Sequence, residues 1–377
     1  MNSAHSGGVL WLAIQNVGTL ARARTKNYFS PDARPEYRQH PLLENEDDLQ
    51  SIKTLLPKWG IPKEENPRLT VLGGGVSNLV VKVVSQSKGA FVVKRSLPKL
   101  RVEEDWFADR RRIMREAACL RVIGDYVGQN FAPKVLLEDA QNFACLLECA
   151  PEGTVTWKKD LLENKVDPRV TEEVSSFLSN FHGRTRTSEK VREEFANQSN
   201  FIQLRINPYL VRVSERHPDL KMQLDEMITG LLSKKLCLVH GDFSPKNILL
   251  LPGGKIWMID CEVAHWGNPA FDVAFCTNHL LLKAIHLSSL RHLKEADRFW
   301  GDYWQESGWS HQEPFTTRVL GGLMLARVDG KSPAEYLSEG DRNLVRGLSR
   351  SLVADRVEDF GQVTTAIEKR IQGDTRS

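Results

Sequence analysis

The chain has 377 residues, of which 41% are hydrophobic and 26% charged, with a formal net charge of +3. This length suits two or three domains, and the composition is that of an ordinary soluble globular protein. The small net charge and the lack of an apolar run of roughly 18 residues exclude the usual signs of nucleic-acid and membrane partners. The six cysteines lie mostly in apolar runs without a C-x-x-C pair, which indicates reduced core residues of a cytoplasmic protein.

Residues 1–42 differ from the rest of the chain. A short apolar run at 9–14 is followed by several arginines, and no acidic residue precedes Asp32. This composition touches on that of a transit peptide, but the apolar run is too short for a secretory signal. We expect a poorly ordered N-terminal extension, a folded part that begins near Leu43, and an opening helix over 47–59.

A glycine-rich turn follows, between two expected strands. It contains Gly73, Gly74, Gly75 and Ser77, and the apolar run 79–84 comes directly after it. Glycines let the backbone approach phosphates closely and adopt positive φ without strain. The turn is therefore a candidate phosphate-binding loop, and a plain β-hairpin explains it equally well.

The next expected strand, 90–94, ends in Lys94. A lysine at this place resembles the nucleotide-binding lysine that kinases carry on a strand, although most strand lysines simply face solvent. Apolar residues at helical spacing predict a helix over 103–123. Within it, Glu116 is the candidate ion-pair partner that orients Lys94, and Glu104 is the second choice.

The remainder of the chain reads as mainly helical. After a strand over 144–148, a helix is expected to start at Asp167-Pro168, with an apolar stripe that belongs to the core. A further helix is expected to begin near Asp272. This residue is either an acid of the first helical turn, favoured by the helix dipole, or a structural acid bonded to the loop described below. A helix start is also expected at Ser332-Pro333.

Aromatic and acidic residues are concentrated over 294–309. Trp300, Tyr303 and Trp304, together with Asp297, could hold a cationic acceptor through ring faces and charge. Packing between helices is the more common fate of such aromatics, and it is the favoured interpretation.

The most informative motif lies between apolar runs. A strand over 236–239 leads into a loop with His240-Gly241-Asp242 and Asn247, and a hairpin over 248–259 then leads to Asp260. Phosphoryl transfer needs a carboxylate near the attacking hydroxyl and oxygen ligands for Mg²⁺. Asp242 fits the first role, and Asn247 and Asp260 fit the second. Each short motif alone could be an ordinary turn, but the two at this spacing favour a kinase site.

The loop matches the pattern His-Gly-Asp-x-x-x-x-Asn, and the chain resembles the aminoglycoside phosphotransferase superfamily, which includes choline kinases and methylthioribose kinases. The resemblance implies an α+β, two-lobed protein-kinase-like fold. A small antiparallel-sheet N-lobe would span 43–149, and a larger, mainly helical C-lobe would span 150–370. It further implies that Asp242 is the catalytic base and that Asn247 and Asp260 bind the metal.

Further positions follow from the same resemblance. The hinge between the lobes would follow the strand 144–148, so that backbone groups of Glu148 and Ala150 face the adenine. Glu262 stands two positions after Asp260, a spacing similar to that of choline and methylthioribose kinases. It could join a metal through water or form a hydrogen bond near the acceptor.

The expected activity is Mg²⁺-dependent transfer of the γ-phosphoryl group of ATP to a hydroxyl of a small molecule that resembles an aminoglycoside, choline or methylthioribose. Lys94 would bind the phosphates. A nucleotide-binding pseudokinase or regulatory module is the alternative. A protein kinase is disfavoured, because no Arg precedes Asp242 and Asp260-Cys261-Glu262 stands where Asp-Phe-Gly would be. The acceptor, the choice between ATP and GTP, and the oligomeric state stay open.

Overall fold

The computed structural model describes residues 46–73, 77–101 and 108–374. The expected N-terminal extension, Gly74 and Gly75 of the glycine-rich turn, and Glu104 lie outside the described residues. Within this part of the chain, none of the helices combines the length and the apolar character that a membrane span requires.

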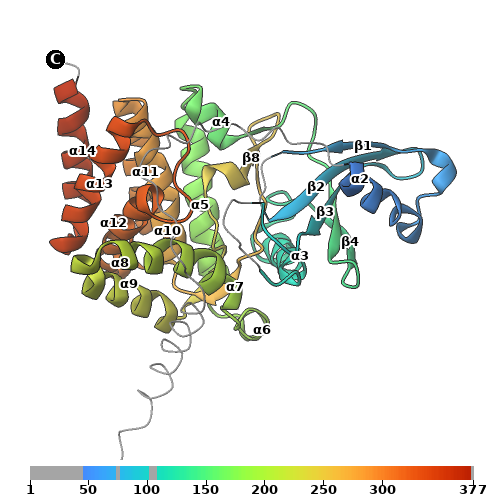
Figure 1. Cartoon of the computed structure of the whole chain (residues 1–377), viewed down its shortest axis with the longest axis horizontal. Coiled ribbons are helices and arrows are strands. Elements are labelled where there is room, and N and C mark those ends of the chain that lie inside the picture. The colour runs from blue at the N-terminus through green and yellow to red at the C-terminus, as the bar shows by residue number, and fades with distance from the viewer. Residues whose placement is uncertain (1–45, 74–76, 102–107, 375–377) are drawn as a thin grey trace, which may run out of the picture. The chain divides into compact units, whose positions relative to one another are not determined.

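The order of elements is that of a sheet followed by helices (Figure 1). The strands are β1 (Arg68–Val71), β2 (Asn78–Ser85), β3 (Gly89–Ser96), β4 (Val135–Asp139), β5 (Ala144–Glu148), β6 (Val155–Thr156), β7 (Cys237–Val239), β8 (Ile248–Leu250), β9 (Ile256–Met258) and β10 (His265–Gly267). The helices are α2 (Glu46–Lys53), α3 (Arg112–Val122), α4 (Trp157–Leu162), α5 (Pro168–Thr185), α6 (Glu189–Glu194), α7 (Ser199–Phe201), α8 (Arg212–Arg216), α9 (Lys221–Ser233), α10 (Ala270–His286), α11 (Leu290–Ser307), α12 (Glu313–Asp329), α13 (Glu339–Ala354) and α14 (Phe360–Asp374).

Short helical segments complete the chain. The π-helical segments are η3 (Ile123–Val127) and η4 (Ile202–Val211), and the 3₁₀ turns are η1 (Leu56–Trp59), η2 (Lys63–Glu65), η5 (Pro218–Leu220), η6 (Pro245–Asn247) and η7 (Ser310–Gln312). The η4 segment contains Pro208, whose missing N–H is one reason for the irregular hydrogen bonding there.

The first part of the fold is an antiparallel five-stranded sheet in the order β1-β2-β3-β5-β4. Lys94 on β3 lies opposite Val80 on β2 and Cys145 on β5, so it occupies an inner strand. This confirms the small sheet and the three expected strands that surround the glycine-rich turn and Lys94.

Two smaller sheets shape the loop that carries Asp242. The strand β7 pairs with β10, and β8 pairs with β9 in the expected hairpin, with β6 at the outer edge of β8. The loop between β7 and β8 is therefore fixed at both ends by strand pairing.

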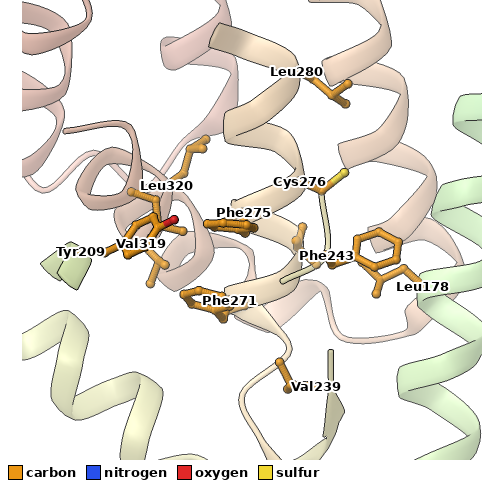
Figure 2. Packing of buried hydrophobic residues seen from close by; sticks show 14 of the residues in the cluster. Leu178, Tyr209, Val239, Phe243, Phe271, Phe275, Cys276, Leu280, Val319 and Leu320 are labelled. Atoms are coloured by element: carbon orange, nitrogen blue, oxygen red, sulfur yellow. The ribbon is translucent and has the colours of Figure 1, made fainter. Parts of the chain in front are cut away.

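The apolar residues form two clusters. The smaller one joins α2 and η1 to one face of the five-stranded sheet, and the larger one fills the helical part. In the larger cluster, Phe271 and Phe275 of α10 pack near Tyr209 and Val319 (Figure 2). Five of the six cysteines are buried, and none forms a disulfide within the described residues.

Three expected helix boundaries were wrong. The helix predicted over 103–123 begins at Arg112 in the described residues, and the opening helix ends at Lys53 before a separate 3₁₀ turn that Pro57 helps to start. The helix expected at Ser332-Pro333 starts at Glu339 instead, where Ser338 and Asp341 form a capping box. In that case the better cap six residues downstream determines the start.

Candidate active site

The N-terminal turn of α10 positions the loop between β7 and β8, which carries Asp242. The carboxylate of Asp272 accepts the backbone N–H groups of His240 at 2.6 Å and Gly241 at 2.9 Å. Its Oδ2 also lies 3.2 Å from Nε2 of His182. Asp272 is fully buried, so these bonds are not shared with water. The interpretation of Asp272 as a structural acid bonded to this loop is confirmed.

His240 is held as a neutral ring with one defined tautomer. Its Nδ1 accepts the N–H of Asp242 at 3.2 Å, so the proton lies on Nε2, which donates to the Ile259 carbonyl at 3.2 Å. Burial lowers the pKa of His240, against the opposing charges of nearby carboxylates. The ring therefore ties the loop to the strand end that precedes Asp260.

The Asp242 carboxylate is buried and lies between two cationic side chains. Nη2 of Arg205 lies 2.8 Å from Oδ1, and Nζ of Lys246 lies 3.0 Å from Oδ2. Nδ2 of Asn247 donates to the same Oδ2 at 2.7 Å. Burial alone would raise the pKa of Asp242, but the charges of Arg205 and then Lys246 outweigh it and hold the pKa below its ordinary value. Asp242 is therefore an anion over the whole neutral range.

Asn247 contributes to the loop through its amide nitrogen. Nδ2 donates to the Asp242 backbone carbonyl at 2.9 Å in addition to the carboxylate, and the Asn247 carbonyl accepts the N–H of Ile259 at 3.0 Å. The side-chain oxygen is thus the atom of Asn247 that could face a cation.

Asp260 comes together with the predicted ion pair of the sheet. Nζ of Lys94 lies 2.7 Å from the Glu116 carboxylate and 2.5 Å from that of Asp260. Asp260 has a left-handed backbone with φ of 65°, an uncommon conformation for a residue with a side chain and one that often marks a functional site. The charges of Lys94 and Lys246 overcome the effect of burial and lower the pKa of Asp260.

Glu116 is the more protonated member of this group. Burial raises its pKa to about 7, against the charge of Lys94, and the carboxylates of Asp260 and Glu262 add to the rise. Lys94 itself keeps its charge, because the surrounding carboxylates raise its pKa despite burial.

Glu262 lies beside the same group and connects it to the start of the sheet. Its Oε2 accepts Nδ2 of Asn78 at 2.8 Å and Nε of the fully buried Arg112 at 3.1 Å. Ligand oxygens of Glu116, Asp260 and Glu262 lie within 4.8 Å of one another. An all-oxygen set of carboxylates at this spacing fits a hard divalent cation such as Mg²⁺.

Of the other predicted nucleotide-binding residues, the structure describes Gly73, Ser77, Glu148 and Ala150. Ser77 is buried, and its backbone carbonyl accepts bonds from Arg112 at 2.5 Å and from the N–H of Leu97 at 3.0 Å. Gly73 is exposed, two positions after the end of β1. The Glu148 N–H donates to the Lys134 carbonyl at 2.9 Å, so that N–H is already used.

The aromatic side chains of α11 do not form a cradle for a ligand. Trp300, Tyr303 and Trp304 are buried, with Trp300 stacked on Phe360 at 4.2 Å and Tyr303 bonded to His182 at 2.9 Å. They pack α11 against its neighbours, so the interpretation as a binding site for a cation was wrong and the core interpretation holds.

Two residues at the site were not expected from the sequence. Lys246 lies within the loop motif, four positions after Asp242, and this spacing was the available signal. Arg205 lies on η4, where nothing in the neighbouring sequence marks it, and it reaches both the Asp242 carboxylate and the Gly241 carbonyl, the latter at 2.9 Å.

Two curated proteins are similar to this chain in sequence, and both are methylthioribose kinases. Methylthioribose kinase of Pectobacterium carotovorum subsp. carotovorum (strain PC1) is 26% identical over 254 residues, which cover 60% of this chain and 62% of that protein. The corresponding enzyme of Pectobacterium atrosepticum is 25% identical over 257 residues, again with 60% and 62% covered. The chain thus matches less than two thirds of the length of these curated relatives.

Solved structures share the protein-kinase-like fold. A complex of the amicoumacin kinase hAmiN with AMP-PNP, Ca²⁺ and Ami superimposes with a TM-score of 0.53 at 14% identity, over 85% of this chain and 99% of that one. The Plasmodium vivax ethanolamine kinase superimposes with a TM-score of 0.52 at 17% identity, over 83% and 91%. The model of the phosphotransferase enzyme family matches residues 68–305, more than half of the chain. On this match the chain belongs to the phosphotransferase enzyme family.

Proposed function

We propose that the chain is a small-molecule kinase that transfers the γ-phosphoryl group of ATP to an alcohol, with Mg²⁺ as cofactor. One observation carries the proposal. The buried anion Asp242 lies on a loop that His240 and Asn247 bind to the strand end at Asp260, where a lysine of the sheet meets a cluster of carboxylates. The named activities of the relatives, methylthioribose kinase and ethanolamine kinase, support the same class of reaction.

Each residue has a role that its contacts suit. Asp242 would accept the hydrogen bond of the acceptor hydroxyl, orient its oxygen and take the proton as the new P–O bond forms. Because its pKa is held low, Asp242 would act first as an orienting anion and only late as a base. Arg205 and Lys246 fix both carboxylate oxygens in place, which limits the rotation of the group.

The cation and the nucleotide would be held by side chains from both parts of the fold. Asp260 and the side-chain oxygen of Asn247 are the proposed Mg²⁺ ligands, and a carboxylate oxygen of Glu262 lies within 4.8 Å of one of Asp260. Lys94, oriented by Glu116, would bind phosphate oxygens, and the glycine-rich sequence from Gly73 to Ser77 stays the candidate phosphate-binding loop. Bound Mg·ATP would supply the phosphoryl group and neutralise the charge that develops on it.

The base would contact the chain after β5. The carbonyl of Glu148 is the group of that residue proposed to face the adenine, since its N–H is bonded to Lys134. The N–H of Ala150 has no acceptor among the described residues, so it is available to a ring nitrogen of the base.

The test is ADP release from Mg·ATP in the presence of pooled alcohols: aminoglycosides, amino alcohols, methylthioribose, sugars and sugar acids. Asp242→Asn keeps the size of the side chain, and we expect it to lower turnover by about 10²-fold to 10⁴-fold. Asp225→Asn, an exposed acid of α9 paired with Lys221, is the matched control. Unchanged turnover in Asp242→Asn would refute the role of Asp242. Nucleotide binding without turnover in any pool would favour a binding module.

A further inference from the structure

Five cationic side chains lie near one another between Asp242 and the helices α4, α10 and α12. This group, called here the cationic cluster, consists of Lys158, Arg205, Lys246, Lys283 and Arg327. Two of its members, Arg205 and Lys246, contact Asp242 directly. The other three belong to α4, α10 and α12, and the proposed function gives them no role.

A continuous line of contacts joins these residues to Asp242. The Arg205 guanidinium lies 5.9 Å from the ring of Phe275, which in turn lies 5.8 Å from the ring of Tyr209 and 5.0 Å from that of His279. Nη1 of Arg327 lies 3.4 Å from the Tyr209 hydroxyl. Figure 2 shows Tyr209 and Phe275 facing one another between α10 and η4. The cluster therefore begins at Asp242 and extends along α10.

Lys283 and Lys158 form the far end of the line. Nζ of Lys283 donates to the His279 carbonyl at 3.0 Å and lies 5.3 Å from the centre of the Tyr336 ring, and Nζ of Lys158 lies 5.9 Å from the same ring. Lys158 pairs with the exposed Glu335. The side chains of Lys246 and Lys158 are 44% and 32% exposed, so the cluster reaches solvent at both ends while its middle is buried.

The cluster carries an excess of positive charge. Asp242 is shared by Arg205 and Lys246, and Glu335 pairs with Lys158. Within the described part of the chain, neither Arg327 nor Lys283 forms an ion pair, although both are buried. Nε of Arg327 has no hydrogen-bond partner there, and neither has the Tyr336 hydroxyl.

Stability does not explain such an arrangement. A buried charge without a counter-ion is costly, and like charges that face one another add to the cost. The strain is visible at Lys283, since burial and the charges of Lys158 and Arg327 lower its pKa to about 7. The pKa of His279 is lowered for the same reasons, so its ring is neutral and can donate one hydrogen bond. A negatively charged ligand would offset all of these costs at once.

We infer that the acceptor alcohol carries a negatively charged group, a carboxylate or a phosphate, which binds Arg327, His279 and Lys283 while its hydroxyl lies at Asp242. The inference rests on the proposed function for the place of the hydroxyl. Arginine offers planar, two-pronged recognition of either anion, and Lys283 adds a point charge. The same charges disfavour amino sugars and amino alcohols, whose ammonium group would lie among cations.

The test compares four compounds with one carbon skeleton: gluconate and glucose 6-phosphate as anions, glucose as the neutral compound and glucosamine as the cation. Binding is measured by titration calorimetry on protein saturated with Mg·AMP-PNP, so that no turnover is needed. We expect both anions, or one of them, to bind at least about tenfold tighter than glucose, and glucosamine to bind more weakly than glucose. A preference for only one anion would identify carboxylate or phosphate as the group.

Variants distinguish a role of Arg327 and Lys283 in anion binding from a purely structural role. Arg327→Gln keeps polar contacts to Tyr209 and Ser332 but removes the charge, and we expect it to reduce the preference for the anion about tenfold. Lys283→Met serves as a second variant if Arg327→Gln does not fold. Arg318→Gln, on the same helix and paired with Glu358, is the matched control and should leave the preference unchanged.

The outcomes distinguish the two proposals. Equal binding of all four compounds, no measurable binding of either anion, or a preference that survives in both Arg327→Gln and Lys283→Met would overturn the inference. Turnover of glucose or glucosamine that is lost in Asp242→Asn would leave the kinase function intact while overturning the anionic acceptor. Charge-selective binding that depends on Arg327, without ADP release from any alcohol, would support the anion site and count against the kinase.

Discussion

The buried guanidinium of Arg112 donates to the carboxylate of Glu262 at 3.1 Å, across 150 positions of sequence. The same Arg112 donates to the backbone carbonyls of Ser77 at 2.5 Å and Leu97 at 2.9 Å. Asn78, the first residue of β2, meets the same Glu262 oxygen. One arginine thus connects the end of the glycine-rich turn, the end of β3 and the segment after Asp260.

The first prediction concerns the stability that this arginine provides. Arg112→Gln removes the ion pair of the buried Glu262 and takes one hydrogen bond each from the carbonyls of Ser77 and Leu97, and we expect a loss of about 3 kcal/mol or more in the free energy of unfolding. Urea unfolding measures the difference. Arg111→Gln removes an exposed guanidinium one position earlier and should change stability by no more than about 0.5 kcal/mol. Equal effects of the two variants would show that the buried contacts contribute little.

A second prediction separates backbone strain from a steric clash in the Asp242 loop. Gly241 and Gly253 both have positive φ, 79° and 88°. A Cβ at Gly241 would lie 2.8 Å from the Val263 carbonyl oxygen, whereas a Cβ at Gly253 would meet nothing within 4 Å. We expect Gly253→Ala to cost about 1–2 kcal/mol, and Gly241→Ala to cost about 1–3 kcal/mol more.

The two glycine variants should also differ in turnover. Gly241→Ala moves the backbone that holds Asp242, so turnover should fall together with stability, while Gly253→Ala at the β8–β9 turn should keep its turnover. Thermal unfolding and ADP release measured on both proteins decide the point. Similar losses of stability in the two alanine variants would mean that the loop adjusts to the new methyl group.

Local patterns in the sequence were enough to predict that Asp242, Asn247 and Asp260 come together. Asp242, Asn247 and Asp260 lie on one strand, loop and hairpin, and each is positioned by pairing between neighbouring segments. The pair of Lys94 and Glu116 was also predictable, because consecutive elements of a chain are usually neighbours in space. These contacts depend little on how the distant helices pack.

Contacts between distant segments could not be predicted in the same way. Arg205 reaches Asp242 from an irregular helix, and Asn78 reaches Glu262 across 184 positions. A signal did exist for the cationic cluster: Lys283 and Arg327 each interrupt a helix whose neighbouring residues are apolar and buried. A buried charge without a counter-ion costs free energy, and this cost makes the two positions stand out. For the aromatics of α11, the favoured interpretation as helix packing was confirmed, but the sequence alone left binding open because packing and binding use the same residues.

A third prediction follows from the contact of Arg205 with Asp242. Removal of the guanidinium takes away the largest influence that lowers the pKa of Asp242, so this pKa rises in Arg205→Gln. In the proposed mechanism Asp242 orients the hydroxyl in its ionised form, and therefore the acid limb of the kcat/KM profile should move to higher pH, by about one unit. The profile is measured on the best acceptor.

Two controls make this shift specific. Arg205→Lys keeps a positive charge near Asp242, so its acid limb should stay near that of the wild type even if its turnover falls. Arg212→Gln, on the neighbouring helix and paired with Glu215, should leave the limb unchanged. An acid limb that does not move in Arg205→Gln would mean that Asp242 is not the group that titrates.

The last prediction uses the pH dependence of stability to detect the buried charge of Lys283. Its pKa is about 7 in the folded protein and about 10.5 when the side chain is exposed. Between these values the unfolded chain binds more protons than the folded one, so this residue makes stability rise with pH across that window. At about pH 7 and below, the folded protein bears the full cost of the buried ammonium.

Lys283→Met removes that cost and should be more stable than the wild type at about pH 7 and below, by a few kcal/mol. The advantage should shrink as the pH approaches about 10, because the wild-type lysine is then neutral in the folded state. Urea unfolding at about pH 7 and about pH 9.5 measures it, with Lys221→Met on the exposed face of α9 as control. A destabilised Lys283→Met at both pH values would mean that the hydrogen bond of Lys283 to His279 and its contact with Tyr336 outweigh the buried charge, and that the ammonium belongs to the scaffold and not to a ligand site.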